Sequence, residues 1–466
     1  MGLNLFNTLS RSVQEFTPLA PPKVGMYCCG PTVYDFAHIG NWRTFVFADL
    51  VRRCLELKNF QVTHVMNITD VEDKIIKGVR EKKTTLREFT GKYESAFFED
   101  LKALNCLEPH HKPHATEFIP EIISLIEQLL ARGFAYKAQD GSVYFSIEKY
   151  RCAGCTYGKL LKLNFEELRT GERVKSDEYA KESIADFALW KARAADDGEV
   201  FWPSSFGEGR PGWHIECSAM SMKILGPGFD LHLGGEDLVF PHHEDEIAQS
   251  EGATGKPFVK HWMHGAHLLV EGKKMSKSLG NFFTLRDLLA KGFTGREIRY
   301  LLLTAHYRET FNFTMDGLQG AKSALARIDE CMSKLKEIAG QTTANPDDAL
   351  IAKVGTAMDE DLNVSGAWGI IFEWIRELNK SLATGQLTPA QSATALATWR
   401  AIGEGLFGLS MPGEIEIPAD IVALFEARQA ARKAKDFKKS DAVRAELQAK
   451  GWGIEDTIKG PKLKKI

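Results

Sequence analysis

Cysteine, histidine and carboxylate side chains recur in three short segments of this sequence, and together they could hold a metal ion. Cys28 and Cys29 are adjacent on a predicted strand, so their side chains point to opposite faces and only one can reach a shared site. Cys29 is better placed, because Gly30 and a loop follow it. Cys217 ends the run GWHIEC. Two thiolates, an imidazole and a carboxylate form a plausible zinc shell.

The imidazole and the carboxylate come from the segment PHHEDE. His242 and Glu246 lie four residues apart, so on a helix opened by Pro241 they share one face. His243 lies three residues before Glu246 and fits the same geometry, so spacing alone does not choose between the two histidines. The chain has 8 cysteines without a repeating framework, which favours a metal over disulfides in a reducing compartment.

A further cysteine pair, Cys152 and Cys155, has the spacing CxxC. The sequence contains no second CxxC and no thioredoxin-like context, so we expect a structural or incidental role for this pair. The sequence alone leaves open whether the pair binds a second metal.

Two other segments could bind phosphate. The tetrad HIGN at residues 38–41 falls at a predicted helix start, where unpaired N–H groups and the helix dipole favour an anion. Gly40 permits close approach, and His38 can donate to an α-phosphate as charge builds in the transition state. Lys274 and Lys277 lie in a glycine-flanked loop, where two flexible cations can grip a triphosphate and neutralise leaving pyrophosphate.

The elements that must position these residues form an α/β fold. Residues 24–30 are predicted to form a buried strand, and a loop, an apolar-periodic helix and a second strand at 61–68 follow. This βαβ unit is typical of one half of a Rossmann-type parallel sheet. The second half is predicted to resume near Gly212, with strands at 229–233 and 259–270.

We therefore expect a Rossmann-type catalytic domain with an inserted subdomain, a helical bundle and a small C-terminal domain. The predicted segments are a first catalytic half at 1–100, a connective insertion at 101–211, a second half with the lysine loop at 212–290, the bundle at 291–410 and the C-terminal region at 411–466.

Composition narrows the class of protein. The hydrophobic fraction is 44%, no apolar run approaches the roughly 20 residues of a membrane span, and no secretory signal is recognisable, so we expect a soluble cytoplasmic protein that does not bind membranes. The net charge of -3 argues against bulk attraction to nucleic acid. From Arg428 onward, however, the chain contains 12 Lys or Arg and only 5 Asp or Glu. On its own, this excess of positive charge is typical of a solvated amphipathic helix.

The motifs resemble those of a known class of enzymes. HIGN and KMSKS, in this order on two halves of one sheet, resemble the HIGH and KMSKS motifs of class I aminoacyl-tRNA synthetases, although Asn41 replaces the second histidine. The segments CCG, GWHIEC and PHHEDE are similar to the zinc-ligand segments of cysteinyl-tRNA synthetases, and the resemblance continues to the tail at 451–456. It implies one zinc ion per subunit, with the ligands Cys29, Cys217, His242 and Glu246.

This resemblance also implies a reaction. ATP with Mg²⁺ would activate L-cysteine to cysteinyl-adenylate, and tRNA(Cys) would then accept the cysteinyl group, in a monomeric enzyme. The resemblance assigns catalysis to His38, Lys274 and Lys277, ATP binding to these with Gly40 and Asn41, and amino-acid binding to Gly30, Thr32, Trp213 and Asp237. A zinc ion would select the thiolate of cysteine, because shape alone separates such similar side chains by only about 1 to 3 kcal/mol.

Two other functions share parts of this pattern. A ligase that joins activated cysteine to a sugar amine, as in the mycothiol pathway, would have the same core but would not need the basic C-terminal segment, in which Trp452 and Asp456 are candidates for reading RNA bases. A non-catalytic RNA-binding paralogue would be expected to lose the phosphate-site residues, and this sequence retains them.

Overall fold

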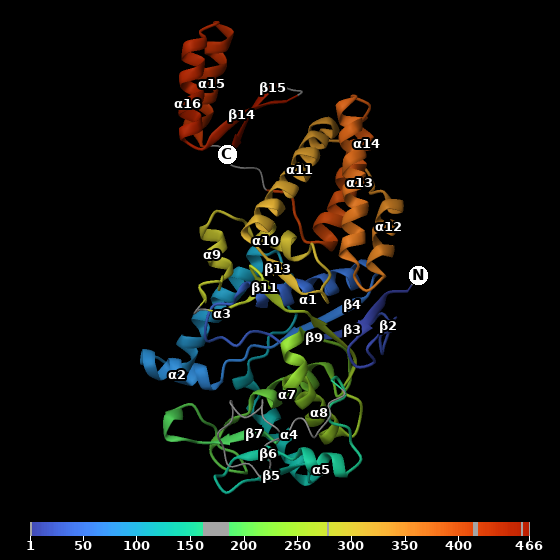
Figure 1. Ribbon diagram of the computed structural model, residues 1–466, viewed down its shortest axis with the longest axis vertical. Coiled ribbons are helices and arrows are strands. Elements are labelled where there is room, and N and C mark those ends of the chain that lie inside the picture. The colour runs from blue at the N-terminus through green and yellow to red at the C-terminus, as the bar shows by residue number, and fades with distance from the viewer. Residues whose placement is uncertain (1, 162–185, 277–278, 413–417, 458–459, 466) are drawn as a thin grey trace. The chain divides into compact units, whose positions relative to one another are not determined.

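The computed structural model describes residues 2–161, 186–276, 279–412, 418–457 and 460–465 (Figure 1). The chain divides into two compact units, Met1–Ser410 and Met411–Ile466, and each is described by itself. No helix in the described ranges is both long and apolar enough to cross a membrane.

The first unit is built on a four-stranded parallel sheet of order β10-β9-β3-β4. Its strands are β3 (Lys23–Cys28), β4 (Gln61–Met66), β9 (Phe229–Gly235) and β10 (Val259–Gly265). All residues of β9 are buried, as expected for a parallel strand covered by helices on both faces. The predicted Rossmann-type α/β class is therefore confirmed.

Helices connect and cover these strands. The helix α1 (Ile39–Leu57) joins β3 to β4, α7 (Trp213–Leu225) precedes β9, and α8 (Glu244–Thr254) joins β9 to β10. Because β3 pairs directly with β9, the sheet brings together two sequence regions about 200 residues apart. Two further helices, α2 (Asp73–Lys82) and α3 (Leu86–Ala103), follow β4, and a hairpin of β1 (Asn4–Asn7) and β2 (Ser12–Glu15) precedes β3.

The segment between the two halves of the sheet forms its own antiparallel sheet of order β5-β6-β7-β8. The elements of this segment are α4 (Ile119–Ala131), β5 (Ala135–Lys137), β6 (Val143–Phe145), α5 (Ile147–Cys152), β7 (Phe187–Ala192) and β8 (Gly209–Pro211). The strands β5 and β6 pair as an antiparallel hairpin. This sheet and α4 share a buried apolar cluster with α7, so the insertion supports the helix that carries Cys217.

The sequence predicts one strand over residues 259–270, and this prediction is wrong. The chain leaves the central sheet after Gly265, and β11 (Leu268–Val270) belongs to a separate three-stranded sheet with β12 (Lys273–Lys274) and β13 (Phe311–Phe313). The backbone N–H of Ala266 donates to the carbonyl of Tyr307, 2.8 Å away, which redirects the chain. Apolar periodicity does not reveal such a change of partner.

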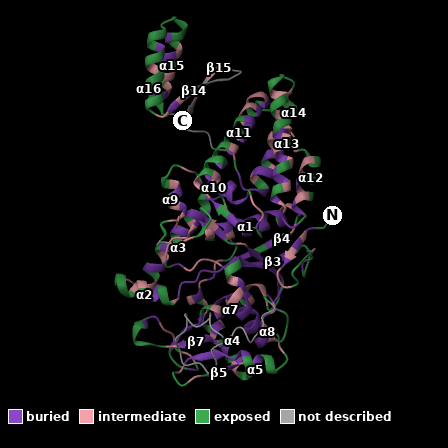
Figure 2. Cartoon of the chain, in the orientation of Figure 1, coloured by how far each residue is buried: buried purple, intermediate pink, exposed green. Residues whose placement is uncertain are grey.

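Helices make up the rest of the first unit. They are α9 (Leu285–Ala290), α10 (Gly295–Leu302), α11 (Met315–Ala339), α12 (Asp348–Met358), α13 (Val364–Ala383) and α14 (Pro389–Trp399), which a wide helical turn, Arg400–Leu406, follows. Each long helix of this bundle has a buried stripe and an exposed face (Figure 2), as expected for amphipathic helices around a shared core.

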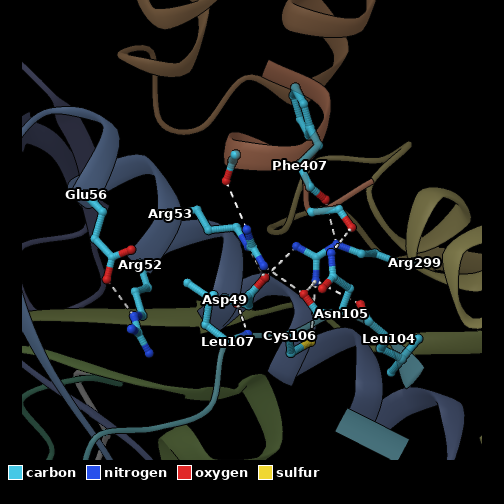
Figure 3. Close-up of polar contacts among 12 residues, drawn as sticks. Asp49, Arg52, Arg53, Glu56, Leu104, Asn105, Cys106, Leu107, Arg299 and Phe407 are labelled. Atoms are coloured by element: carbon cyan, nitrogen blue, oxygen red, sulfur yellow. Dashed lines mark hydrogen bonds and ion pairs between the residues drawn. The ribbon is translucent and has the colours of Figure 1, made fainter. Parts of the chain in front are cut away.

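A buried charged network fixes α1 to α10 and to the turn after α14 (Figure 3). The carboxylate of Asp49 accepts from Arg53, 2.7 Å away, and from Arg299, 2.5 Å away. Arg299 also donates to the carbonyl of Phe407, and the backbone N–H of Leu107 donates to Asp49. The two guanidinium groups and the N–H thus pair a carboxylate that would otherwise be costly to bury.

The second unit consists of α15 (Ala419–Lys433), α16 (Phe437–Ala449) and the antiparallel pair β14 (Trp452–Thr457) and β15 (Gly460–Lys465). Its small core contains Ile421, Leu447 and Trp452. Trp452 is only 5% exposed, so its ring is not available to stack on a base, contrary to the sequence-based hypothesis. The side chain of Asp456 lies outside the described part of the structure.

Candidate metal and nucleotide site

Four elements deliver the side chains of a buried metal-binding cluster. Cys29 directly follows β3, Cys217 lies in α7, His242 lies in the wide turn Val239–His243, and Glu246 lies in the first turn of α8. Their ligand atoms all lie within 4.8 Å of one another, and all four residues are buried. The two Sγ atoms are 4.0 Å apart, and His242 Nε2 is 3.0 Å from Glu246 Oε1.

This donor set fits a zinc ion. With Zn–S bonds of about 2.3 Å, two thiolates on a tetrahedral ion lie about 3.8 Å apart, close to the observed separation of the two sulfurs. Two thiolates and an imidazole are also the soft and intermediate ligands that favour zinc over magnesium or calcium. The structure thus brings together the four residues that the resemblance named as metal ligands.

A second set of four ligands overlaps the first. His232, in β9, and His243 join Cys29 and Glu246, and their ligand atoms also lie within 4.8 Å of one another. His232 Nε2 is 2.8 Å from Glu246 Oε2, and His243 Nε2 is 3.4 Å from Cys29 Sγ. His232 was not expected as a ligand from the sequence, although its place one residue before the end of the expected strand at 229–233 is a usable signal.

The side chains of the cluster shift one another's pKa values. A hydrogen bond from the Cys29 thiol lowers the pKa of Cys217 to about 6, and burial raises the pKa of Cys29 itself. Burial raises the pKa of Glu246, but His232 and His242 outweigh it and lower that pKa to about 2. Burial lowers the pKa of His242, but Glu246 and Cys217 raise it to about 10. Cys217 and Glu246 are therefore anionic, whereas Cys29 and His242 hold protons that a metal ion displaces when it binds.

Outer contacts orient the ligands. His214 Nδ1 lies 2.8 Å from His242 Nδ1, and His214 Nε2 lies 3.4 Å from a carboxylate oxygen of Asp245. On the other side, His243 Nδ1 is 2.7 Å from His264 Nε2. Such contacts to the far ring nitrogen fix the orientation of a metal-binding histidine.

The remaining cysteines of the sequence hypothesis lie apart from this cluster. Cys28 is fully buried on the other side of the strand, and burial raises its pKa to about 12. Cys152 is exposed and Cys155 is half-buried. Within the described residues, neither of them belongs to a group with metal-binding geometry.

The first phosphate motif forms the start of α1. His38 is the N-cap, its Nδ1 accepts from the N–H of Asn41 at 3.2 Å, and the side-chain oxygen of Asn41 accepts from the N–H of His38 at 3.1 Å. This reciprocal capping box gives Asn41 a structural task that the sequence analysis missed. A Cβ atom on Gly40 would lie 2.8 Å from the methyl carbon of Met275, so the two motifs are in contact.

The second motif begins in β12, where Lys274 is exposed. The backbone N–H of Ile39 donates to the carbonyl of Phe283 at 2.9 Å, and the ring of Phe282 packs edge-on against His38. These contacts hold the segment that follows the lysine loop against the first turn of α1. Lys277 lies outside the described residues.

The expected amino-acid pocket lies at the carboxyl ends of β3 and β9. The N–H of Gly30 donates to the side chain of Asn67 at 2.9 Å, and Thr32 forms a bridge with Thr69. Trp213 opens α7, is 38% exposed, and places its ring 4.4 Å from that of His242. Asp237 is exposed in the turn after β9. This edge, where the chain leaves β3 and β9 in opposite directions, is where such sheets bind ligands.

The sheet, the two contacting phosphate motifs and the cysteine–histidine cluster define a class I aminoacyl-tRNA synthetase. Methionyl-tRNA synthetase of Mycobacterium tuberculosis, solved with methionyl-adenylate, has the same fold, with a TM-score of 0.59 at 15% identity over 82% of this chain and 89% of that chain. Leucyl-tRNA synthetase of Agrobacterium radiobacter also has a TM-score of 0.59, at 12% identity over 84% of this chain and 85% of its own.

Sequence comparison narrows the class to one family. Residues 15–323 match the class I (C) tRNA synthetase catalytic domain, 353–411 the DALR domain, and 415–460 the cysteinyl-tRNA ligase anticodon binding domain. The chain is 47% identical to the cysteine–tRNA ligase of Chlamydia muridarum over the full length of both, and 46% identical to that of Protochlamydia amoebophila over 99% and 98%. It belongs to the cysteinyl-tRNA synthetase family of ligases.

Proposed function

We propose that this ligase activates L-cysteine with Mg-ATP and transfers the cysteinyl group to tRNA(Cys), acting as a cytoplasmic monomer. The carboxylate of cysteine attacks the α-phosphate of ATP, pyrophosphate leaves, and a terminal ribose hydroxyl of the tRNA then displaces AMP. No protein nucleophile is required. The observation that carries this proposal is the buried cluster of two cysteines, a histidine and a glutamate, in the same unit as the two contacting motifs.

The cluster supplies the specificity. Cys29, Cys217, His242 and Glu246 would hold the zinc ion. When bound, zinc favours the thiolate of a cysteine substrate over the hydroxyl of serine, which is far harder to ionise. Trp213 would close this pocket, because its half-exposed ring packs on His242. Asp237 would pair with the substrate ammonium, and Gly30 and Thr32 would line the wall at the end of β3.

The two phosphate motifs would accelerate the activation of cysteine. The N–H groups at the start of α1 would receive phosphate, with Gly40 leaving space and Asn41 keeping the turn capped. His38 would donate to the α-phosphate, while Lys274 and Lys277 would neutralise the leaving pyrophosphate. These groups act mainly by positioning and charge stabilisation, and neither needs a covalent intermediate on the protein.

The second unit would bind the anticodon. Phe437, at the start of α16, is 64% exposed, and Lys435, Lys438 and Lys439 lie within two residues of it in the sequence. An aromatic ring among cations is typical of a platform that stacks on single-stranded bases. We propose Phe437 for this role in place of the buried Trp452.

The sugar-amine ligase is not favoured, because residues 415–460 match an anticodon-binding domain and the full-length relatives are named cysteine–tRNA ligases. Such a ligase would have no use for that domain. A purified enzyme that charged a sugar amine but no tRNA would overturn this choice.

The proposal is tested by exchange between pyrophosphate and ATP, measured with each amino acid in turn. We expect exchange with cysteine, little with serine, and loss of the cysteine reaction when a chelator removes zinc. Added zinc should restore it. Equal rates with serine and cysteine, or a cysteine rate that survives complete removal of the metal, would contradict zinc-based selection.

A further inference from the structure

A buried cation on α1 is held by backbone carbonyl oxygens, and the carboxylate of Glu309 adds only a longer-range attraction. Arg43 lies five residues after His38 and is only 4% exposed. One of its terminal nitrogens, Nη2, donates to the backbone carbonyl oxygens of His306, 3.1 Å away, and Glu309. Its other terminal nitrogen, Nη1, has no hydrogen-bond partner, and no ion pair to Arg43 occurs in the described part of the chain. Burying a guanidinium in this way is costly, so a specific role is expected to maintain it.

The two carbonyls belong to the segment that supports the lysine loop. This segment leads into β13, which runs parallel to β11, and β11 pairs with β12, the strand that carries Lys274. The N–H of Phe311 donates to the carbonyl of His267 at 3.0 Å, so the segment is joined to the chain that enters β11. The guanidinium carbon of Arg43 also lies 5.0 Å from the centre of the Phe311 ring.

The same face of α1 makes a second contact with this segment. Phe47, one helical turn after Arg43, stacks on Tyr307 with ring centres 4.4 Å apart and an interplanar angle of 7°. The stacked rings supply contact area, whereas Arg43 supplies directional hydrogen bonds that fix the register of the helix against the segment. A helix is stiff over the roughly 7.5 Å that separate Arg43 from the N-cap, so a shift at one position reaches the other.

We propose that Arg43 is a positioning residue that sets the separation between the two phosphate-binding motifs, the His38 turn of α1 and the lysine loop after β12. It holds α1 and the support of the loop in one register through the carbonyls of His306 and Glu309. This inference rests on the proposed function of the two motifs. Arg43 itself does not touch the substrate.

The test is the variant Arg43→Met, which keeps most of the side-chain volume but removes the donors. We expect kcat for cysteine-dependent pyrophosphate exchange to fall by about 10- to 100-fold, because a misplacement near 1 Å costs up to about that much. The KM for cysteine and the zinc content should stay at wild-type values, since the metal cluster lies on other elements. Rates are normalised to active sites titrated by burst formation of adenylate, so loss of folded protein does not count.

Arg296→Met is the matched control. Arg296 lies on α10 and forms a bidentate pair with Asp329 of α11 at 2.8 and 2.7 Å, so its loss also removes a partly buried arginine contact in this region. We expect a lower melting temperature but an unchanged kcat. Arg43→Lys, which can still reach one carbonyl, should recover part of the rate.

A double-mutant cycle with Lys274→Ala separates positioning from general damage. If Arg43 acts by placing the lysine loop, Arg43→Met should slow the Lys274→Ala enzyme by much less than it slows the wild type. Equal slowing in both backgrounds, or a wild-type kcat in Arg43→Met, would overturn the inference. A wild-type enzyme without cysteine-dependent exchange would instead reject the proposed function itself.

Discussion

At the scale of single residues, the neighbouring histidines of the metal cluster have different partners. His242 lies beside Glu246 and shares a ligand set with both Cys29 and Cys217. His243 approaches Cys29 but is held from behind by His264, in a set with one cysteine. Because thiolates are the strongest zinc ligands available here, the set with two cysteines should bind the metal more tightly.

We therefore predict that His242→Asn loses zinc, whereas His243→Asn keeps it. Removal of a ligand should weaken zinc binding by more than the roughly 10- to 100-fold that loss of an outer partner costs, and His243→Asn should stay within that range. The measurement is zinc per protein after dialysis against a graded series of chelator concentrations. If His243→Asn released zinc first, the metal would belong to the other ligand set.

Much of this site could be predicted from residue types, and the remainder depended on contacts between elements. The residues Cys29, Cys217, Glu246 and the histidine pair are visible in short segments, and the structure brings them together. Spacing alone could not choose between the two histidines, because both lie within one helical turn of Glu246. Trp452 was a candidate for reading RNA bases because it lies in the basic tail and has an aromatic ring, and only the packing of the second unit shows that it is buried.

At the scale of elements, α1 links the proposed nucleotide site to the helical bundle. His38 caps its N-terminus, and its later turns carry Asp49, which pairs with Arg53 and Arg299 (Figure 3). The β3–α1–β4 order was predictable from apolar periodicity. The network was not, because Arg299 lies 250 residues from Asp49 in the sequence.

We predict that Asp49→Asn lowers the free energy of unfolding by about 3 to 5 kcal/mol at pH 7, since two buried guanidinium groups lose their counter-charge. Burial raises the pKa of Asp49, but Arg299 and Arg53 outweigh it, and the net pKa is lowered. A carboxyl with a lowered pKa contributes stability above its unfolded pKa of about 3.9 and loses it as the pH falls further. The gap between wild type and variant should therefore narrow below about pH 4.

Urea unfolding at pH 7, 5 and 3.5 measures this gap. Glu56→Gln is the control, because Glu56 forms the same kind of pair with Arg52 on the same helix, but its side chain is 38% exposed. Its loss should cost no more than about 1 kcal/mol. A gap for Asp49→Asn that stays constant from pH 7 to 3.5 would show that the carboxylate charge is not what stabilises this joint.

At the scale of the whole molecule, the two units divide the proposed work between them. The first unit contains the metal cluster and both phosphate motifs, and the second contains the basic hairpin of α15 and α16. The excess of positive charge in the tail was visible in the sequence. Which aromatic residue is exposed, however, depends on how the small core of this unit packs. In this unit Trp452 lies in the core and Phe437 is exposed.

If Phe437 stacks on an anticodon base, its loss should affect tRNA and nothing else. We predict that Phe437→Ala raises the KM for tRNA(Cys) by about 5- to 150-fold, which corresponds to the roughly 1 to 3 kcal/mol of one base–aromatic stack. Pyrophosphate exchange, which needs no tRNA, should keep its wild-type rate. Phe437→Tyr, which preserves the ring, should keep a KM near that of the wild type. Aminoacylation rates over a range of tRNA concentrations give these values, and an unchanged KM in Phe437→Ala would place the contact with the anticodon elsewhere in the second unit.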